Sequence, residues 1–156
     1  MPEKSARLLE ALKRRKLTLA SAESLTGGLF GATLCQVPGA SEAYRGGVIA
    51  YQKQLKQRLL GVDAKTIEEH SVVSAEVAAE MAEGCLRATQ SDIAISCTGN
   101  AGPGAEKGGK AVGCVYLGLA DRANLSTKEL SLSGSREQIR QQTVEAMIDL
   151  LLSNLS

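Results

Sequence analysis

Hydrophobic residues recur along this chain with two periods, and the two periods alternate. A spacing near 3.6 residues, typical of an amphipathic helix, places Leu8, Leu9 and Leu12 on one side of a charged segment. Short apolar or alternating runs, typical of strands, lie between such segments. We expect helices at residues 4–15, 29–35, 54–60, 64–69, 74–89 and 135–153. We expect strands at residues 17–22, 46–51, 93–97, 112–120 and 126–132.

Capping and turn residues mark the ends of these elements. Ser74 fits a helix N-cap, and Ser135 with Gln138 forms the pattern of a capping box. Pro38 and Gly39 predict a turn, and residues 99–109 form a glycine-rich loop. Helices and strands alternate first, and a hairpin comes late. We therefore predict one α/β domain over residues 1–156, with three layers (α/β/α) and a mixed, mostly parallel sheet.

Composition narrows the functional classes. The chain has 156 residues, 44% of them hydrophobic, and a net charge of +1, which disfavours nucleic-acid or membrane-surface binding. One Phe, three Tyr and no Trp leave little aromatic surface for stacking on bases. No apolar run is long enough to span a membrane, and the first 16 residues lack the pattern of a signal peptide. We expect a cytoplasmic protein.

Cysteine and histidine usage limits the possible chemistry. The four cysteines show no C-x-x-C spacing, and we expect buried free thiols. His70 is the only histidine and fits the exposed end of a helix. No metal site is expected. A base that activates a nucleophile would then be a lysine, a tyrosine or a carboxylate.

Three stretches combine glycines with reactive polar groups, at residues 22–28, at 39–41 leading to Tyr51 and Lys56, and at 98–103. Each lies where a strand ends or a helix begins, the usual place for ligands in α/β folds. Structural roles also fit these residues. Ser41 suits a helix N-cap, Tyr51 the end of a strand, and Lys56 or Arg136 a solvated charge. Glu23 suits an internal carboxylate that binds loop amides.

Seven motifs occur in a fixed order along the chain. They are A-E-S-L-T-G-G (22–28), V-P-G-A-S (37–41), G-G-V-I-A-Y (46–51) followed by Lys56, L-L-G-V (59–62), V-S-A-E-V-A (73–78), T-G-N-A-G-P (98–103) and V-G-C-V (112–115). In this order and spacing they resemble the CinA C-terminal domain family, which includes bacterial deamidases of nicotinamide mononucleotide (NMN). The resemblance covers residues 5–152.

The resemblance implies hydrolysis of the NMN carboxamide to nicotinate mononucleotide and ammonia, in pyridine-nucleotide salvage. It implies a homodimer that needs no metal or cofactor and takes a small nucleotide as substrate. Matched by motif, the catalytic residues are Ser41 as nucleophile, with Tyr51 and Lys56 as its activating partners. The matched substrate-binding residues are Glu23, Ser24, Thr26, Gly27, Gly28, Thr98, Gly99, Asn100, Ala101, Gly102 and Arg136.

Amide hydrolysis by Ser41 requires Lys56 as a neutral amine, acting directly or through Tyr51. Burial, or a nearby cation such as Arg136, would lower the lysine pKa enough. Backbone N–H groups of residues 26–28 or 99–104 could bind either an oxyanion or a phosphate. Asn100 replaces the family's usual Ile, which keeps open an amidase for another small amide. A third hypothesis is a non-catalytic ligand-binding or interaction module tied to competence and DNA damage.

Overall fold

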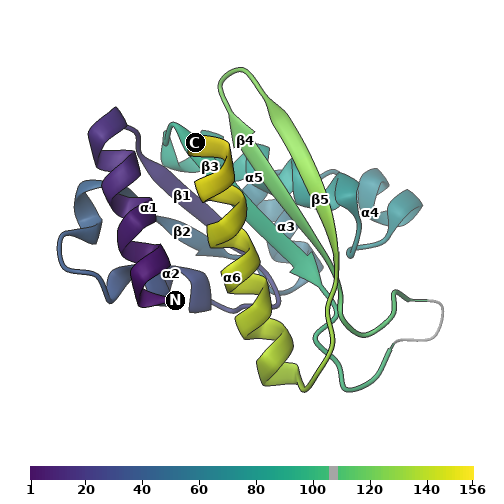
Figure 1. Ribbon diagram of the computed structural model, residues 1–156. Helices are drawn as coiled ribbons and strands as arrows, with labels where there is room; N and C mark the ends of the chain where they lie inside the picture. The colour runs from purple at the N-terminus through teal and green to yellow at the C-terminus, as the bar shows by residue number, and fades with distance from the viewer. Residues whose placement is uncertain (106–108) are drawn as a thin grey trace.

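A computed structural model describes residues 1–105 and 109–156 (Figure 1). Residues 106–108 of the predicted glycine-rich loop lie outside the described residues. The helices are α1 (Pro2–Arg15), α2 (Leu29–Cys35), α3 (Lys53–Leu60), α4 (Ala64–His70), α5 (Ala75–Thr89), α6 (Arg136–Leu155) and a short 3₁₀ helix, η1 (Ala40–Glu42). The strands are β1 (Leu19–Glu23), β2 (Tyr44–Ile49), β3 (Ile93–Gly99), β4 (Cys114–Asp121) and β5 (Leu125–Ser131).

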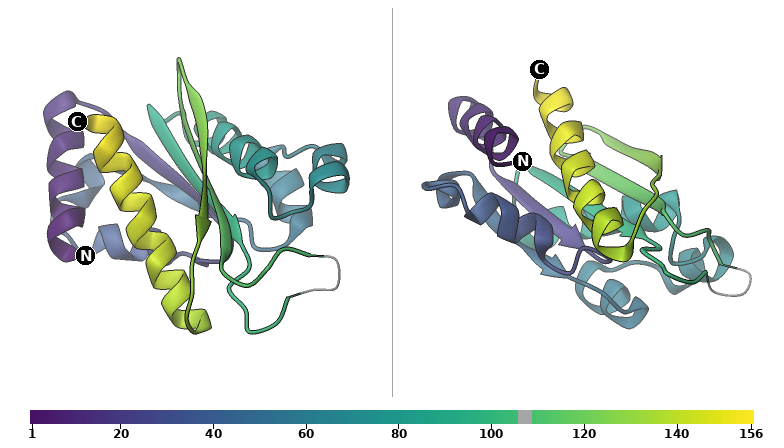
Figure 2. Two further views of the ribbon diagram at one scale, coloured as in Figure 1. Left: turned by 45° about the vertical axis from the view of Figure 1, so that its right-hand side comes forward. Right: turned by 60° about the horizontal axis from the view of Figure 1, so that its bottom comes forward.

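The described strands form one mixed sheet in the order β2-β1-β3-β4-β5. Strand β1 pairs in parallel with β2 and β3, whereas the β3–β4 and β4–β5 pairs are antiparallel. Helices α1, α2 and α6 cover one face, and α3, α4 and α5 cover the other (Figure 2). The predicted three-layer α/β fold with a mixed sheet is confirmed, with half of its strand pairings parallel.

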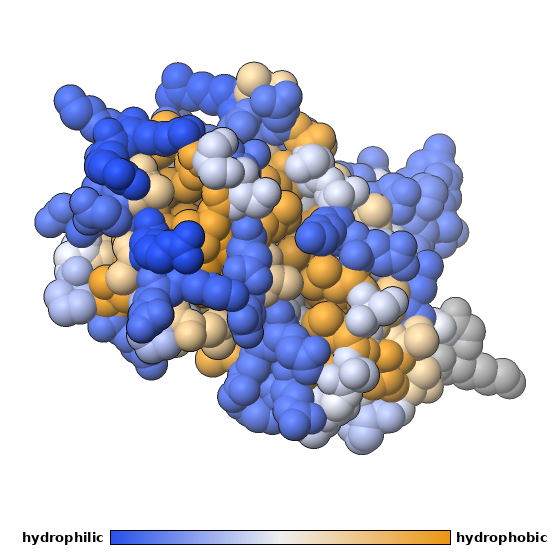
Figure 3. Space-filling model, in the orientation of Figure 1, coloured by the Kyte–Doolittle hydropathy of each residue, from blue (hydrophilic) through white to orange (hydrophobic). Residues whose placement is uncertain are grey.

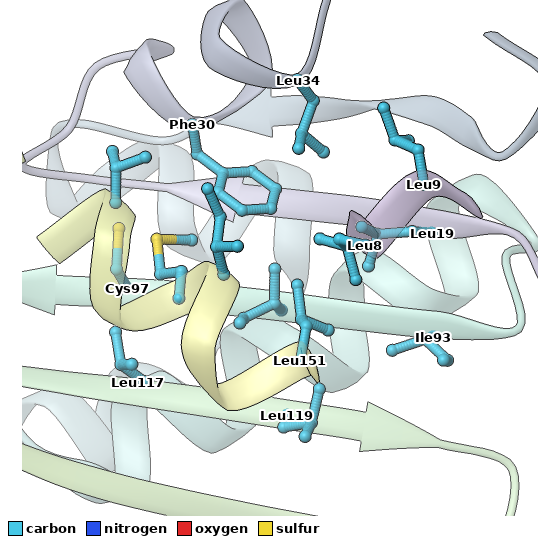
Figure 4. Close-up of a cluster of buried hydrophobic side chains, with 14 of the residues drawn as sticks. Leu8, Leu9, Leu19, Phe30, Leu34, Ile93, Cys97, Leu117, Leu119 and Leu151 are labelled. Carbon is cyan, nitrogen blue, oxygen red and sulfur yellow. The ribbon is translucent and has the colours of Figure 1, made fainter. Parts of the chain in front are cut away.

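The two faces of the sheet carry side chains of different size. Toward α1, α2 and α6 the strands point large residues such as Leu19, Ile95 and Leu117, which pack with Phe30 in the larger core (Figure 4). In Figure 3, which views the molecule from this side, patches of hydrophobic residues are visible among hydrophilic ones. Toward α5 the strands present mainly small residues: Ala20, Ala22, Ala94, Ser96 and Gly118. This smooth face lets the α5 backbone approach the sheet closely.

The bounds of strand β2 differ from the prediction. Strand β2 covers Tyr44–Ile49 instead of residues 46–51, so Tyr51 lies beyond the strand and just before α3. The hydrophobic pattern continues through Ala50, but ladder pairing with β1 ends at Ile49. The shift matters because the carbonyl groups of Ala50 and Tyr51, beyond the strand, then bind the side chain of a later residue.

The structure confirms the predicted position of His70 and contradicts part of the prediction for the cysteines. His70 ends α4 with its side chain 43% exposed, as expected. Cys85 and Cys97 are buried free thiols, whereas Cys35 is exposed and Cys114 is half-buried, so the prediction of uniform burial was wrong. Cys35 is the last residue of the short helix α2, where its side chain turns outward. None of the described helices has the length and apolarity needed to cross a membrane.

Candidate active site

The three parallel strands end at one edge of the sheet, and the segments that follow them form the candidate site. Because β2 and β3 both run parallel to β1, their carboxyl ends lie side by side, as the sequence predicts for an α/β ligand site. The amino end of α6 reaches the same edge, where Arg136 contacts Gly102 and Arg140 contacts Leu25. This edge lies where α6 begins in Figure 1.

Lys56 is the central side chain of this edge. It lies in the first turns of α3, which begins after the N-cap Gln52 and returns the chain over the end of β1. Although it is a lysine, its side chain is fully buried. Its Nζ atom lies 2.8 Å from the Ser24 Oγ, 2.7 Å from the Ala50 carbonyl oxygen and 3.1 Å from the Tyr51 carbonyl oxygen.

Burial changes the protonation of Lys56. Loss of hydration lowers its pKa from 10.5 to about 8, and the nearby Cys97 opposes this shift only in part. At pH 7 about a tenth of the molecules therefore hold a neutral amine, compared with fewer than about one in a thousand for an exposed lysine. A pKa near neutrality is the property that a general base requires.

The three oxygen neighbours also orient the amine. The two carbonyl oxygens, of Ala50 and Tyr51, can only accept hydrogen bonds, so they take the two N–H groups of a neutral amine. In the protonated amine the third N–H donates to the Ser24 Oγ. In the neutral amine the lone pair takes the place of that N–H, and the Ser24 hydroxyl can then donate its proton to Nζ. This geometry matches a nucleophile paired with its base.

Ser24 comes from the turn that follows β1 and is 7% exposed. Ser24 lines a cavity of about 240 Å³, and its Oγ contacts Lys56 Nζ. Sequence analysis placed Ser24 among the substrate-binding residues and assigned the nucleophile to Ser41. The signal for Ser24 was its place at a strand exit before two glycines, whereas Ser41 was assigned through the motif that follows the Pro38–Gly39 turn.

The structure does not bring Ser41 and Lys56 together within one chain. Ser41 is exposed in η1, which enters β2 at its amino end, where Ala43 binds Leu19 at the start of β1. The Lys56 site lies at the carboxyl end of the same parallel strands. A strand of six residues spans about 20 Å, which separates the two ends. The Pro38–Gly39 turn was placed correctly, but it leads into the opposite edge of the sheet.

Tyr51 and Arg136 form one wall of the cavity. The Tyr51 hydroxyl accepts a hydrogen bond from Arg136 Nη2 at 2.8 Å, and Arg136 Nη1 donates to the Gly102 carbonyl at 2.6 Å. Arg136 is the first residue of α6 and is fixed by the Ser135–Gln138 capping box, as predicted. Tyr51 is 55% exposed, and its hydroxyl binds Arg136. Its contact with Lys56 is made by its backbone carbonyl oxygen.

Arg140 belongs to the same edge, and sequence analysis missed it. Its Nε donates to the Leu25 carbonyl at 3.0 Å, and its Nη2 donates to the Thr26 carbonyl at 2.9 Å. These two bonds hold the turn that carries Ser24 against α6. Arg140 follows Arg136 by four residues, so both lie on one face of the helix. That spacing was the signal, but exposed basic pairs are common on helices.

Glu23 binds the amino end of α2 rather than open space, in agreement with its structural alternative. Its Oε1 accepts from the backbone N–H of Gly28 at 3.2 Å and of Phe30 at 2.9 Å. Its Oε2 accepts from Gly31 N–H at 3.0 Å. The hydroxyl of Thr26 also donates to Oε1, at 2.6 Å. This carboxylate therefore fixes the turn after Ser24 from inside, and Gly27 supplies a left-handed conformation that the turn needs.

Replacing Glu23 with Gln is expected to lower the free energy of unfolding by about 2 kcal/mol. An amide removes a charge that the helix N-terminus favours and sets an N–H₂ group against a backbone N–H donor. Urea denaturation measures the change, with Glu137→Gln in the first turn of α6 as the matched control, because that side chain is 64% exposed. A Glu23→Gln variant no less stable than the control would contradict this role.

The end of β3 and the segment after it close the cavity. Thr98, Gly99, Asn100 and Ala101 line it together with Ser24. The Thr98 hydroxyl donates to the Val72 carbonyl at 3.0 Å, so it holds the loop before α5 in place. The Asn100 amide binds within its own loop, accepting from Gly102 N–H at 2.9 Å. Gly102 itself has a left-handed backbone, with φ of 81°.

The described residues 1–105 and 109–156 contain no group of three or more His, Cys, Asp or Glu side chains placed to hold a metal ion. The polar groups that meet at this edge are instead a hydroxyl, an amine, a phenol and two guanidinium groups.

Sequence comparison places this chain in a family. The model of the CinA C-terminal domain matches residues 2–155. The chain belongs to the CinA C-terminal domain family. It is 43% identical over 148 residues to a CinA-like protein from Dictyoglomus thermophilum and 42% identical over 138 residues to a competence-damage inducible protein from Clostridium acetobutylicum. It covers 36% and 34% of these two proteins, so it spans about a third of their length.

Solved structures of CinA proteins share the fold. A CinA superfamily protein from Klebsiella pneumoniae superposes with a TM-score of 0.96 at 32% identity, covering 99% of this chain and 96% of that one. A competence/damage-inducible protein from Agrobacterium tumefaciens gives a TM-score of 0.93 at 31% identity, with coverage of 97% and 93%. The resemblance seen in the sequence motifs is therefore confirmed at the level of family and fold.

Proposed function

We propose that this CinA domain is an amidohydrolase that converts NMN to nicotinate mononucleotide and ammonia, with Ser24 as nucleophile and Lys56 as general base. The observation that carries the proposal is the buried Lys56 amine 2.8 Å from the Ser24 hydroxyl, at the wall of a cavity. The choice of NMN rests on the family that the motifs resemble. The nucleophile is Ser24 because Lys56 contacts it, whereas Ser41 lies at the other end of the sheet.

The first half of the reaction forms an ester. Neutral Lys56 takes the proton of the Ser24 hydroxyl while Oγ attacks the carboxamide carbon, which gives a tetrahedral oxyanion. The resulting ammonium donates that proton to the amide nitrogen, the C–N bond breaks, and ammonia leaves. The pyridinium ring of NMN withdraws electrons from the carboxamide, which makes it easier to attack than a peptide bond.

The second half regenerates the enzyme. Lys56, neutral again, takes a proton from a water molecule that attacks the ester carbon. The C–O bond to Ser24 breaks as the Lys56 ammonium returns this proton to the Ser24 Oγ. The carboxylic acid product loses its remaining proton to water and leaves as a carboxylate. Arg136, held by Gly102 and Tyr51, lines the cavity with a positive charge that favours both the oxyanion and the carboxylate product.

Incubating the purified protein with NMN is expected to release one ammonia for each nicotinate mononucleotide formed. Ammonia is measured by a coupled assay, and the carboxylate product is identified by chromatography. The control is a Lys56→Met variant, which keeps a side chain of similar length but has no base. Ammonia release no faster from wild type than from this variant would reject the proposal.

A further inference from the structure

A second cavity adjoins the one that Ser24 lines. It has a volume of about 530 Å³. Five residues line both cavities: Val72, Val73, Gly99, Asn100 and Arg136. A ligand whose reactive end lies at Ser24 can therefore extend into the larger cavity without leaving the protein surface. The larger cavity is within the size range of small-molecule sites.

The charged side chains on the larger cavity have one sign. They are Lys53, Lys110 and Arg136, and no acidic side chain lines the cavity among the residues that the structure describes. Lys53 comes from the start of α3, Lys110 from the segment before β4, and Arg136 from the start of α6. Three cationic residues from three separate elements thus line one space beside the reactive serine, which favours a dianionic group there. The Lys110 amine lies 5.9 Å from the centroid of the Tyr116 ring.

The other possible anion site at this edge is already occupied. The amide N–H groups of Gly28, Phe30 and Gly31, at the amino end of α2, bind the carboxylate of Glu23. The N–H of Gly27 binds the Ser24 carbonyl. These donors are therefore unavailable for a phosphate, although a helix N-terminus after a glycine turn is a common phosphate site.

Asn100 connects the two cavities and holds Lys110 in place. Its side-chain Nδ2 donates to the Lys110 carbonyl at 3.0 Å, and its Oδ1 accepts from Gly102 N–H at 2.9 Å. Its backbone N–H and carbonyl bind Cys114 and Gly113, at the other end of the same segment. The Asn100 side chain therefore fastens the segment of Lys110 to the wall shared with the Ser24 cavity.

We infer that the larger cavity is a phosphate subsite in which Lys53 and Lys110, with Arg136 at the shared wall, select a 5′-monophosphate over the matching nucleoside. The inference rests on the proposed function, because it takes the carboxamide to lie at Ser24. In this arrangement the pyridinium amide occupies the smaller cavity, and the phosphate lies between Lys53 and Lys110. These two lysines then set the specificity for the phosphate.

Two ligands that differ only in the phosphate, NMN and nicotinamide riboside, test the inference. We expect wild type to show a kcat/KM for NMN at least about 100-fold above that for the riboside, because each charge-assisted contact contributes about tenfold. The Lys53→Ala/Lys110→Ala variant is expected to lose at least about tenfold of this preference, mainly through KM for NMN, and to keep its kcat/KM for the riboside. The matched control, Lys65→Ala/Lys128→Ala, removes two exposed lysines and the same charge.

Calorimetric titration of the Ser24→Ala variant gives a readout that needs no turnover. Tighter binding of NMN than of the riboside, abolished by adding Lys53→Ala and Lys110→Ala, supports the subsite even if no amide is hydrolysed. Equal affinity for the two ligands, or a preference that survives both substitutions, overturns it while leaving the hydrolytic proposal intact. Circular dichroism and thermal melting verify that each variant is folded.

Discussion

Ser24→Ala is expected to reduce kcat/KM for amide hydrolysis at least about 10⁴-fold, whereas Ser41→Ala changes it less than about twofold. The first substitution removes the oxygen that Lys56 contacts at 2.8 Å. The second removes an exposed hydroxyl in η1, at the opposite edge of the sheet. Both variants lose a single oxygen atom, so they are a matched pair. Ammonia release from NMN at several concentrations provides the measurement.

The mode of loss separates a missing nucleophile from a damaged fold. Ser24→Ala is expected to keep the thermal stability of wild type within a few degrees and to bind NMN, because Glu23 and Arg140 still hold the turn. Rapid-quench experiments on wild type should reveal an ester on Ser24 that hydroxylamine intercepts. The opposite pattern, with Ser41→Ala inactive and Ser24→Ala active, would assign the nucleophile to Ser41 and exclude the role of Lys56 drawn from this geometry.

The layers of the fold were predictable because hydrophobic spacing records which side of an element is buried. The 3.6-residue repeat of α1 and the short apolar runs of β1 and β3 appear in the sequence as they do in the structure. The Ser135–Gln138 capping box was also predictable, because it involves only residues three positions apart in the sequence. Local patterns do not show at which end of the parallel strands a loop lies, and this limited the prediction of the site.

Ser24 and Ser41 illustrate that limit. Both lie near glycines and next to a strand. Ser24 follows β1 and Ser41 precedes β2, so the parallel pairing of these strands places one serine at the carboxyl end and the other at the amino end. Lys56 is buried in a helix that also carries exposed charged residues, and its Nζ meets three oxygens there. The oxygens come from other segments, so the sequence of α3 does not reveal them. Arg140 acts through backbone carbonyl groups of Leu25 and Thr26, so its spacing from Arg136 shows the shared helix face but not these partners.

The pH dependence of hydrolysis is expected to follow Lys56. For wild type, kcat/KM should rise tenfold per pH unit below pH 7 and level off above an apparent pKa of about 8, because only the neutral amine accepts the serine proton. Lys56→Met is expected to lose at least about 10³-fold of the activity, together with the inflection. Lys65→Met, which removes a lysine of α4 whose side chain is 78% exposed, serves as a control that keeps the inflection. A wild-type profile that is flat between pH 6 and about pH 9 would contradict Lys56 as the base.

The same pKa also predicts how folding stability changes with pH, which can be measured without a substrate. In the folded protein Lys56 loses its proton near pH 8, whereas in the unfolded chain it keeps the proton up to about 10.5. Between these values the unfolded state binds more protons, so raising the pH stabilises the folded state by up to about 1.4 kcal/mol per unit. Below pH 8 this contribution is flat. Urea denaturation of wild type should therefore show stability that increases from pH 8 to about pH 10 relative to Lys56→Met, in which the group is absent. Parallel curves for the two proteins would mean that the Lys56 pKa is not lowered by burial, and the base at the centre of the proposed reaction would be lost.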